Sequence, residues 1–428
     1  MEIMKIKEGI YDKEERKFFL IIDDMIRFIN KYSNNFKKRL SFFILYLFLL
    51  YFFVNKYYYT QKNNKKINLK PFIKYIIDCK NHKRYNRTKI ISKNPYVSIC
   101  IPSFNVGKYI EQSLLSIINQ SFQNFEIIVV NDNSKDNTEK ILKNLKLEDD
   151  RIKIINHLQN KGVYYSRIEA ILNSKGKYII LMDPDDLFLN ENLFQELYDF
   201  NLKYNLDIIE FKVYQQIEGR RKIIYPKRHF ESHFHNFSEF IIYQPYLSDI
   251  LFQIPGKQIY THSICRNIWN KMIRRQVLID MYEYIGTEYF NSFVITSDDI
   301  TMNVISYNFA KNYSNIDLLG YMYNIRPVSM SRGDGGVELQ KIRSINYLLY
   351  FKILYKYIKQ FNKSRKILYN EMKNLKRFIY FIKDGNIISY EKEIKYFLFD
   401  ILNDNYSEKN FKIFVSQLFL YFEKDYKK

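Results

Sequence analysis

From Tyr96 onward, short and mainly apolar runs alternate with segments that are apolar only every third or fourth residue. The short runs have the length of buried strands and lie at residues 97–101, 126–130, 152–155 and 178–182. The segment after the first run places its apolar residues at i, i+4, i+7 and i+8, which is one face of a helix: Ile110, Leu114, Ile117 and Ile118. Further helical segments follow at 139–145 and 166–172. This order predicts an α/β fold whose mostly parallel sheet is flanked by helices on both faces.

Polar side chains follow the predicted strands at the points where they end. Asn105 follows the first strand, Asp132 follows the second, and Asp183, Asp185 and Asp186 follow the fourth. In open parallel sheets, ligands bind at the carboxyl ends of the strands. We therefore expect these residues to surround a binding site at one edge of the sheet.

A different pattern occupies residues 40–54, which contain no charged residue. This run covers roughly 22 Å as a helix, and adding the tyrosines up to Tyr59 gives about twenty residues, enough for a thin bilayer such as that of the endoplasmic reticulum. We predict an N-terminal tail at 1–39, a transmembrane anchor at 40–59 and a stem at 60–94. A buried core helix is the alternative for the apolar run.

The Lys-Lys-Arg cluster at 37–39 favours a cytosolic N-terminus, although basic residues are almost equally frequent on both sides of the run. We therefore expect a single-pass protein of the endoplasmic reticulum or Golgi membrane with a lumenal catalytic domain. After residue 333 the pattern indicates several amphipathic helices, so we divide the remainder into a domain at 95–332 and a helical C-terminal region at 333–428.

Composition changes this picture little. The chain has 428 residues and is 47% hydrophobic and 18% aromatic, so it can bury a sizeable core and is not a disordered chain. Its net charge is +21, but Lys, Asn, Ile, Tyr and Phe are all abundant, which is typical of an A- and T-rich coding sequence. We therefore expect no nucleic-acid partner. The three cysteines are too few and too scattered for a disulfide framework.

The aspartate cluster at 183–186 needs a compensating charge, because three carboxylates within four residues repel one another. Oxygen ligands at a strand end suit Mg²⁺ or Mn²⁺, which bind one or two carboxylates together with substrate phosphates. A helix N-cap is the simpler alternative for a single aspartate. An aspartyl-nucleophile phosphatase is a further alternative, but it usually has Thr or Val where this chain has Leu187.

Five segments together resemble the family 2 glycosyltransferases of the GT-A fold, in the right order over residues 96–332. They are VSICIPSFN (97–105), KYIEQSLLSIINQSFQNFEIIVVNDNSKDNT (108–138), NKGVYYSRIEAILNSKGKYIILMDPDD (160–186), NIWNKMIRRQVL (267–278) and SDDITMN (297–303). The resemblance implies a nucleotide-sugar donor, most simply UDP-linked, and an inverting transfer. It departs from the family at Ile168, where Asn is usual, and at Asp298, where Glu is usual.

The resemblance also assigns roles to residues of this chain. Pro102 and Phe104 match positions that hold the uridine base, Asp132 matches the aspartate that hydrogen-bonds it, and Arg167 matches an arginine that contacts the nucleotide. The cluster would bind the cation that bridges the two phosphates, with Asp183 and Asp185 near the nucleotide and Asp185 and Asp186 as metal ligands. Asp298 and Asp299 match the catalytic acidic pair, and we expect Asp299 to be the general base. Without the resemblance, a helix cap is the favoured interpretation of this pair.

The chemistry agrees with these roles, because the leaving diphosphate needs charge neutralisation and the attacking hydroxyl needs a base on the opposite face of the sugar. We predict a membrane-tethered glycosyltransferase with a glycan, lipid or protein acceptor that the sequence does not identify. The competing hypothesis is an inactive GT-A scaffold or a basic membrane-bound protein that binds anionic polymers. A nucleotidyltransferase would need a Gly-rich basic loop after the first strand, whereas this strand ends in IPSFN.

Overall fold

The computed structural model describes residues 70–85, 89, 91–217, 240–243, 267–326 and 336–361, together with Tyr396 and Ser416. The strands are β1 (Val97–Ser103), β2 (Phe125–Asn131), β3 (Ile152–Asn156), β4 (Tyr178–Leu181), β5 (Leu187–Phe188), β6 (Ile208–Ile217), β7 (Phe240–Tyr243), β8 (Lys271–Arg274) and β9 (Asn312–Ile325). The helices are α3 (Lys70–Lys80), α4 (Ile110–Ile118), α5 (Thr138–Glu148), α6 (Val163–Leu172), α7 (Leu193–Tyr204), α9 (Arg275–Ile285), α10 (Thr287–Phe290), α11 (Asp298–Phe309) and α12 (Gly336–Gln360).

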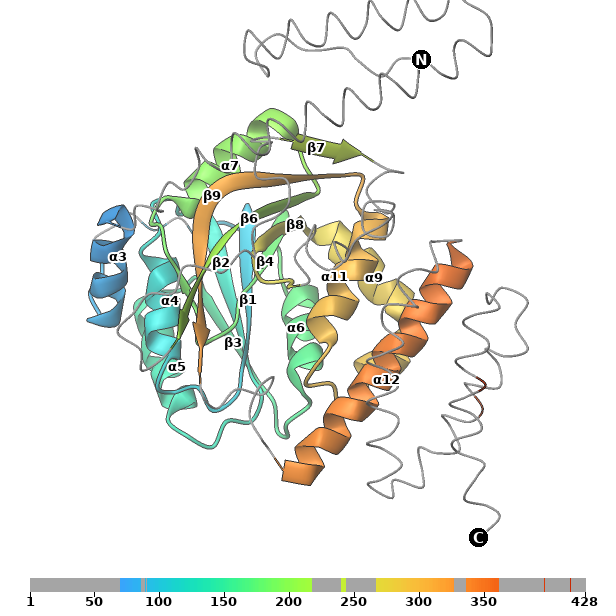
Figure 1. The fold of residues 1–428 in the computed structure, drawn as a ribbon. Helices are drawn as coiled ribbons and strands as arrows, with labels where there is room; N and C mark the ends of the chain where they lie inside the picture. Colours follow the sequence, from blue (N-terminus) through green and yellow to red (C-terminus); the bar gives the residue numbers. More distant parts are fainter. Residues whose placement is uncertain are drawn as a thin grey trace, which may run out of the picture. The chain divides into compact units, whose positions relative to one another are not determined.

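The described strands form one mixed sheet in the order β3-β2-β1-β4-β8-β6-β9-β5, with β7 paired to β9 (Figure 1). The four strands expected from the apolar runs are present, and β1 pairs in parallel with both β2 and β4. From β1 the chain moves outward to β2 and β3 and then returns to β4 on the other side of β1. The carboxyl ends of β1 and β4 therefore flank a topological switch point, where ligands bind in such sheets.

Two hydrophobic cores cover the two faces of the sheet, because successive strand residues point to opposite sides. In β1, Ile99 and Ile101 pack with α4, α5 and α7, whereas Cys100 packs with α6, α9, α11 and α12. Figure 1 shows these two sets of helices on opposite sides of the strands. The expected α/β architecture with helices on both faces is confirmed. The sheet is mixed instead of mostly parallel, because β8 pairs antiparallel with both β4 and β6, and β9 pairs antiparallel with β5 and β7.

The region N-terminal to the sheet is described only from residue 70, so the expected tail and apolar anchor lie outside the described residues. Within the expected stem, α3 is a helix packed against α4. Tyr75 of α3 is buried, and its hydroxyl donates a hydrogen bond to the backbone oxygen of Ser116 over 2.6 Å. In the described ranges, no helix combines the length and apolar character needed to cross a membrane.

The expected C-terminal helical region begins with α12, whose 25 residues pack on the same face of the sheet as α9 and α11. Phe351, Leu354 and Tyr357 are almost completely buried in this core. This helix is therefore part of the folded body that carries the sheet. Beyond residue 361, the helices expected from the sequence lie almost entirely outside the described residues.

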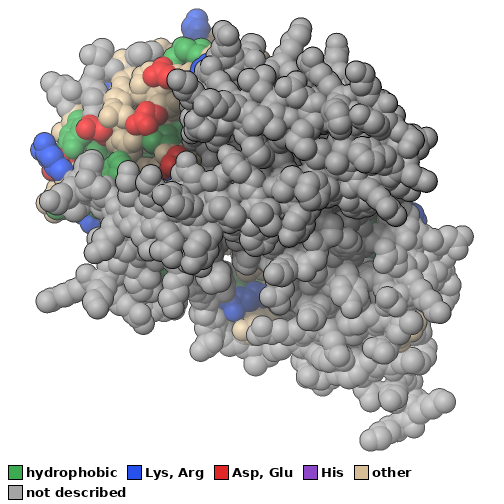
Figure 2. Space-filling view, turned by 45° about the horizontal axis from the view of Figure 1, so that its top comes forward, with side chains coloured by type: hydrophobic (Ala, Val, Ile, Leu, Met, Phe, Trp, Pro, Cys, Tyr) green, Lys and Arg blue, Asp and Glu red, His purple; other side chains and the backbone are tan. Residues whose placement is uncertain are grey.

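The positive charge of the chain is unevenly distributed. Residues 97–217, which include β1 to β6, contain 13 Lys and Arg against 17 Asp and Glu. Figure 2 shows acidic side chains among apolar ones on the described part of one face. The excess of basic residues therefore lies in other parts of the sequence, and the part of the sheet that ends in the aspartate cluster is not basic.

Candidate active site

A cavity of about 690 Å³ opens at the carboxyl ends of β1 and β4. Its walls come from the ends of β1, β2 and β4, the start of α6, the loop before α11, the end of β9 and the first turns of α12. The volume lies within the range of small-molecule binding sites. The cavity therefore occupies the place at which the strand order predicts a ligand.

One end of the cavity combines an exposed aromatic ring with a buried carboxylate. Phe104 is 44% exposed and lies beside Pro102 at the end of β1. Asp132, just after β2, is buried and accepts hydrogen bonds from the backbone nitrogens of Lys161 (2.8 Å) and Gly162 (2.9 Å). Gly162 has a φ of 91°, a conformation that a side chain would strain. These backbone donors fix the direction of the Asp132 carboxylate.

A histidine that we did not single out in the sequence also holds Asp132. His157 lies directly after β3, and its Nδ1 is 2.6 Å from Asp132 Oδ1, while its Nε2 contacts Glu169 of α6. Both ring nitrogens of His157 therefore face carboxylate oxygens. The rule that selected Asn105 and Asp132, a polar residue just after a strand, would also have selected His157.

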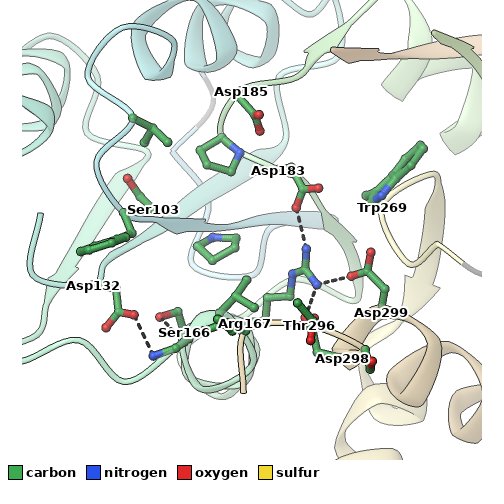
Figure 3. Close-up of a pocket in the computed structure, with 18 of the residues that line it drawn as sticks. Ser103, Asp132, Ser166, Arg167, Asp183, Asp185, Trp269, Thr296, Asp298 and Asp299 are labelled. Atoms are coloured by element: carbon green, nitrogen blue, oxygen red, sulfur yellow. Dashed lines mark hydrogen bonds and ion pairs between the residues drawn. The ribbon is translucent and has the colours of Figure 1, made fainter. Parts of the chain in front are cut away.

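Arg167 of α6 lies at the centre of the cavity floor and joins two acidic groups that are far apart in the sequence. Its Nη2 is 2.6 Å from Asp183 Oδ1, and its Nη1 contacts the carboxylates of both Asp298 and Asp299 (Figure 3). The side chain is only 4% exposed. Burial opposes its charge, but Asp298, Asp299 and Asp183 outweigh this effect and raise the pKa of the guanidinium. The predicted metal cluster and the predicted catalytic pair therefore meet in one cavity.

Asp298 and Asp299 form the first turn of α11, preceded by Ser297 in the left-handed conformation at φ 65°. Asp298 is 6% exposed and Asp299 is 30% exposed, so Asp299 is the more accessible to a ligand. Burial raises the pKa of Asp299 to about 7; Arg167 opposes this rise, and the charges of Asp298 and Asp183 add to it. A carboxylate with a pKa near neutrality is well matched to proton transfer.

The aspartates after β4 do not act as one group. Asp183 and Asp185 line the cavity, and the side chain of Asp185 is paired with Arg326, which follows β9. Asp186 is completely buried and accepts hydrogen bonds from the Tyr321 hydroxyl (2.8 Å) and the Asn324 backbone nitrogen (2.7 Å). Both Asp186 oxygens therefore face β9, and its sharing of a cation with Asp185 stays a prediction.

The two remaining carboxylates fit a divalent cation. Mg²⁺ and Mn²⁺ are commonly held by one or two carboxylates together with substrate phosphates, and Asp183 and Asp185 supply two at the cavity wall. Among the residues that the structure describes, no group of three or more His, Cys, Asp or Glu side chains is arranged around one metal position. A cation at this point would therefore need oxygen atoms from a ligand as well as from the protein.

Asn105, a further residue predicted for the site, lies in the loop that follows β1. It adopts φ 51°, its side-chain oxygen accepts a hydrogen bond from the Lys135 backbone nitrogen (2.7 Å), and its own nitrogen donates to Ser134 Oγ (3.0 Å). It is not among the residues that line the cavity. Asn105 therefore links the loops after β1 and β2 and supports Phe104 from outside the cavity.

Trp269 forms the opposite wall and was not assigned a role in the site from the sequence. It is buried, and its ring stacks on Tyr321 (centroids 4.7 Å apart) and Tyr323 (5.2 Å) of β9. Trp269 and Tyr323 both line the cavity. This rigid aromatic stack holds the end of β9, with Asn324 and Arg326, against the aspartates that follow β4.

The sequence is similar to a family of known proteins. The sequence model of glycosyl transferase family 2 matches residues 98–269. The glycosyltransferase GlyG of Streptococcus pneumoniae is 32% identical over 29% of this chain and 40% of its own length. The uncharacterized glycosyltransferase EpsJ of Bacillus subtilis is 26% identical over 55% of this chain and 63% of its own length. The chain thus spans less than two thirds of either relative.

A crystal structure of S. aureus TarS residues 1–349 in complex with UDP aligns with 77% of this chain and 91% of its own, at 19% identity and a TM-score of 0.45. The family match covers β1, β2, β4 and the aspartates after β4, whereas Asp298 and Asp299 of α11 lie beyond it. Residues 98–269 therefore form a domain of glycosyl transferase family 2.

Proposed function

We propose that this chain is a glycosyltransferase that moves a sugar from a UDP-linked donor to an acceptor hydroxyl, with inversion at the anomeric carbon, on a GT-A fold. The observation that carries the proposal is the contact of Arg167 with both Asp183 and the Asp298–Asp299 pair. Through this contact, a set of carboxylates suited to a metal-bound diphosphate and a set suited to proton abstraction share one cavity.

The nucleotide end of the proposal rests on Phe104 and Asp132. The exposed ring of Phe104 offers a face on which a base can stack. Asp132 accepts three hydrogen bonds from protein groups in the described contacts, and a carboxylate has about four acceptor positions. Uracil carries a ring N–H that can donate to the remaining position, whereas the corresponding nitrogen of cytosine is an acceptor. The remaining acceptor position of Asp132 therefore favours a uridine over a cytidine nucleotide.

The diphosphate end rests on Asp183 and Asp185, which would hold Mg²⁺ or Mn²⁺. Such a cation, when bound, would neutralise the negative charge that develops on the leaving diphosphate. Both carboxylates lie at the carboxyl end of β4, beside the nucleotide end of the cavity. The family match and the donor set support this role.

Asp299 is the proposed general base, because it is more exposed than Asp298 and has a pKa near 7. It accepts the proton of the acceptor hydroxyl as the oxygen of that group forms a bond to the anomeric carbon. The bond from the anomeric carbon to the phosphate oxygen breaks on the opposite side, and the diphosphate leaves with its electron pair. Arg167 and Asp298 orient Asp299 during this step.

Membrane attachment through residues 40–59 is part of the proposal and rests on the sequence alone. The acceptor is left as a glycan, lipid or protein hydroxyl. The alternative of a basic protein that binds anionic polymers gains no support from the cavity, which is lined by five carboxylates, at Asp132, Asp183, Asp185, Asp298 and Asp299.

Release of nucleotide from a set of UDP- and GDP-linked sugars, with Mn²⁺ present and water as the acceptor, tests this proposal. We expect the full chain to release UDP from at least one UDP-sugar, and Asp299→Asn to lower the rate at least about 100-fold, the usual contribution of a general base. Asp317→Asn is the control, because Asp317 is 67% exposed and paired with Lys212 outside the cavity. Undiminished release by Asp299→Asn would contradict the assignment, and UDP binding without release from any sugar would favour an inactive scaffold.

A further inference from the structure

Each cavity-facing aspartate after β4 is paired with an arginine. Asp183 is paired with Arg167 and Asp185 with Arg326. Asn324 donates a hydrogen bond to the backbone oxygen of Asp185 over 2.7 Å, which fixes this loop beside the end of β9. Arg326, two residues after Asn324, is thereby kept within reach of the Asp185 side chain.

The two arginines differ in how firmly they are held. Arg167 is 4% exposed and contacts three carboxylates, so moving it would deprive all three of this partner, including the buried Asp298. Arg326 is 22% exposed and, in the described part of the chain, has one carboxylate partner. Its guanidinium carbon lies 4.9 Å from the ring centre of Tyr109, and its buried Nε has no hydrogen-bond partner among the described residues. Arg326 is therefore free to exchange Asp185 for another anion.

We propose that Arg326 is the resident counter-ion of Asp185 and transfers to the phosphates of the bound nucleotide when Asp185 engages the divalent cation. This inference rests on the proposed function and adds a ligand-exchange step to it. In the ligand-free protein, Arg326 competes with a cation for Asp185. When the cation and the nucleotide are bound, the planar guanidinium of Arg326 can bind phosphate oxygens through two donors, including the unused Nε.

The exchange makes cation and nucleotide binding depend on each other. A cation alone must displace Arg326 from Asp185. Among the described residues, the contacts of the Arg326 guanidinium are then reduced to the uncharged ring of Tyr109. A nucleoside diphosphate supplies an anion for this guanidinium, so each ligand should raise the affinity for the other by the same factor. Binding coupled in this way favours uptake of the complete cation–nucleotide complex over uptake of the cation alone.

The test is the affinity of the full chain for Mn²⁺, measured from the paramagnetic resonance signal of free Mn²⁺, without and with saturating UDP. We expect Arg326→Gln to bind Mn²⁺ alone about tenfold more tightly than the wild type, and UDP in the presence of Mn²⁺ about tenfold more weakly, as expected for hydrogen bonds between charged groups. These changes have opposite signs, which a general loss of structure cannot produce. Adding Asp185→Asn to Arg326→Gln should abolish the gain in Mn²⁺ affinity.

Arg274→Gln is a closely matched control. Arg274 is 23% exposed, is paired with Asp207, and its guanidinium lies 5.0 Å from the ring centre of Tyr178, but it does not line the cavity. The variant Arg274→Gln should leave the affinity for Mn²⁺ alone and the affinity for UDP with Mn²⁺ unchanged. Unchanged or weaker binding of Mn²⁺ alone by Arg326→Gln would overturn the inference. Failure of the wild type to bind UDP would instead refute the proposed function, while the Mn²⁺ comparison would still decide whether Arg326 competes for Asp185.

Discussion

The pH dependence of the reaction is the prediction that the geometry around Asp299 defines most sharply. A general base acts in its ionised form, and the pKa of Asp299 in the ligand-free protein is about 7. The pH profile of kcat/KM reports ionisations of the free enzyme. We therefore expect kcat/KM to be level above pH 7 and to fall tenfold per unit below it, so that at pH 5 about 1% of the activity remains.

The substitution Asp298→Asn should move this acid limb to lower pH. Both carboxylates contact the same Nη1 of Arg167, so their oxygens are no more than about 6 Å apart for hydrogen bonds of ordinary length. Two unit charges at that distance repel by about 3 kcal/mol at an effective dielectric of about 20, or roughly 2 pKa units. Because Asp299 is 30% exposed, solvent screens part of this repulsion, and we expect a shift of about one unit.

The assay is UDP release measured from pH 5 to pH 9 with wild type, Asp298→Asn and Asp299→Asn, in samples whose folding is checked by circular dichroism. We expect Asp298→Asn to remain active, with the acid limb of its kcat/KM profile shifted to lower pH. An inactive but folded and UDP-binding Asp298→Asn, together with an active Asp299→Asn, would show that Asp298 is the base. An acid limb that stays in place would refute the electrostatic reasoning.

Three further predictions concern the scaffold. In a Cys265→Ser background, Cys79 and Cys100 should react with a thiol reagent only after denaturation, because both are buried and burial raises the pKa of the Cys79 thiol to about 12. Phe351→Ala should lower the free energy of unfolding in urea by about 3–5 kcal/mol, and a loss below about 1 kcal/mol would contradict the packing of α12. Gly162→Ala should lower both the melting temperature and the UDP affinity, because the added Cβ would lie 2.7 Å from the backbone oxygen of Val294. An unchanged melting temperature would contradict this prediction.

Much of the sheet could be predicted from the sequence because its strands are short, apolar and separated by periodic helices. The switch point at β1 and β4 follows from that order, and it brings Asp132 and Asp183 to one cavity. The long strand β9 was not predicted, since its residues alternate less clearly and it pairs in parallel with β6, far away in the sequence. As a result, Arg326 could not be placed beside Asp185.

The direction in which a side chain points was harder to predict than the segment in which it lies. The sequence places Asp185 and Asp186 together after β4, but only the packing of β9 shows that Asp186 is bound by Tyr321 and Asn324. Similarly, Asn105 lies at a strand end as expected, yet its left-handed backbone directs its side chain to the Lys135 amide. A pattern of residue types fixes the segment in which a site lies, whereas long-range contacts decide which side chains face the ligand.

We propose above all that this cavity binds a uridine diphosphate group together with a divalent cation held by Asp183 and Asp185. Calorimetric titration of the full chain with UDP and with GDP, each with and without Mn²⁺, tests it most directly. We predict Mn²⁺-dependent binding of UDP, at least tenfold weaker binding of GDP, and loss of the Mn²⁺ dependence in Asp185→Asn. Absence of UDP binding by a folded sample, or UDP binding that is indifferent to both Mn²⁺ and Asp185, would contradict the account.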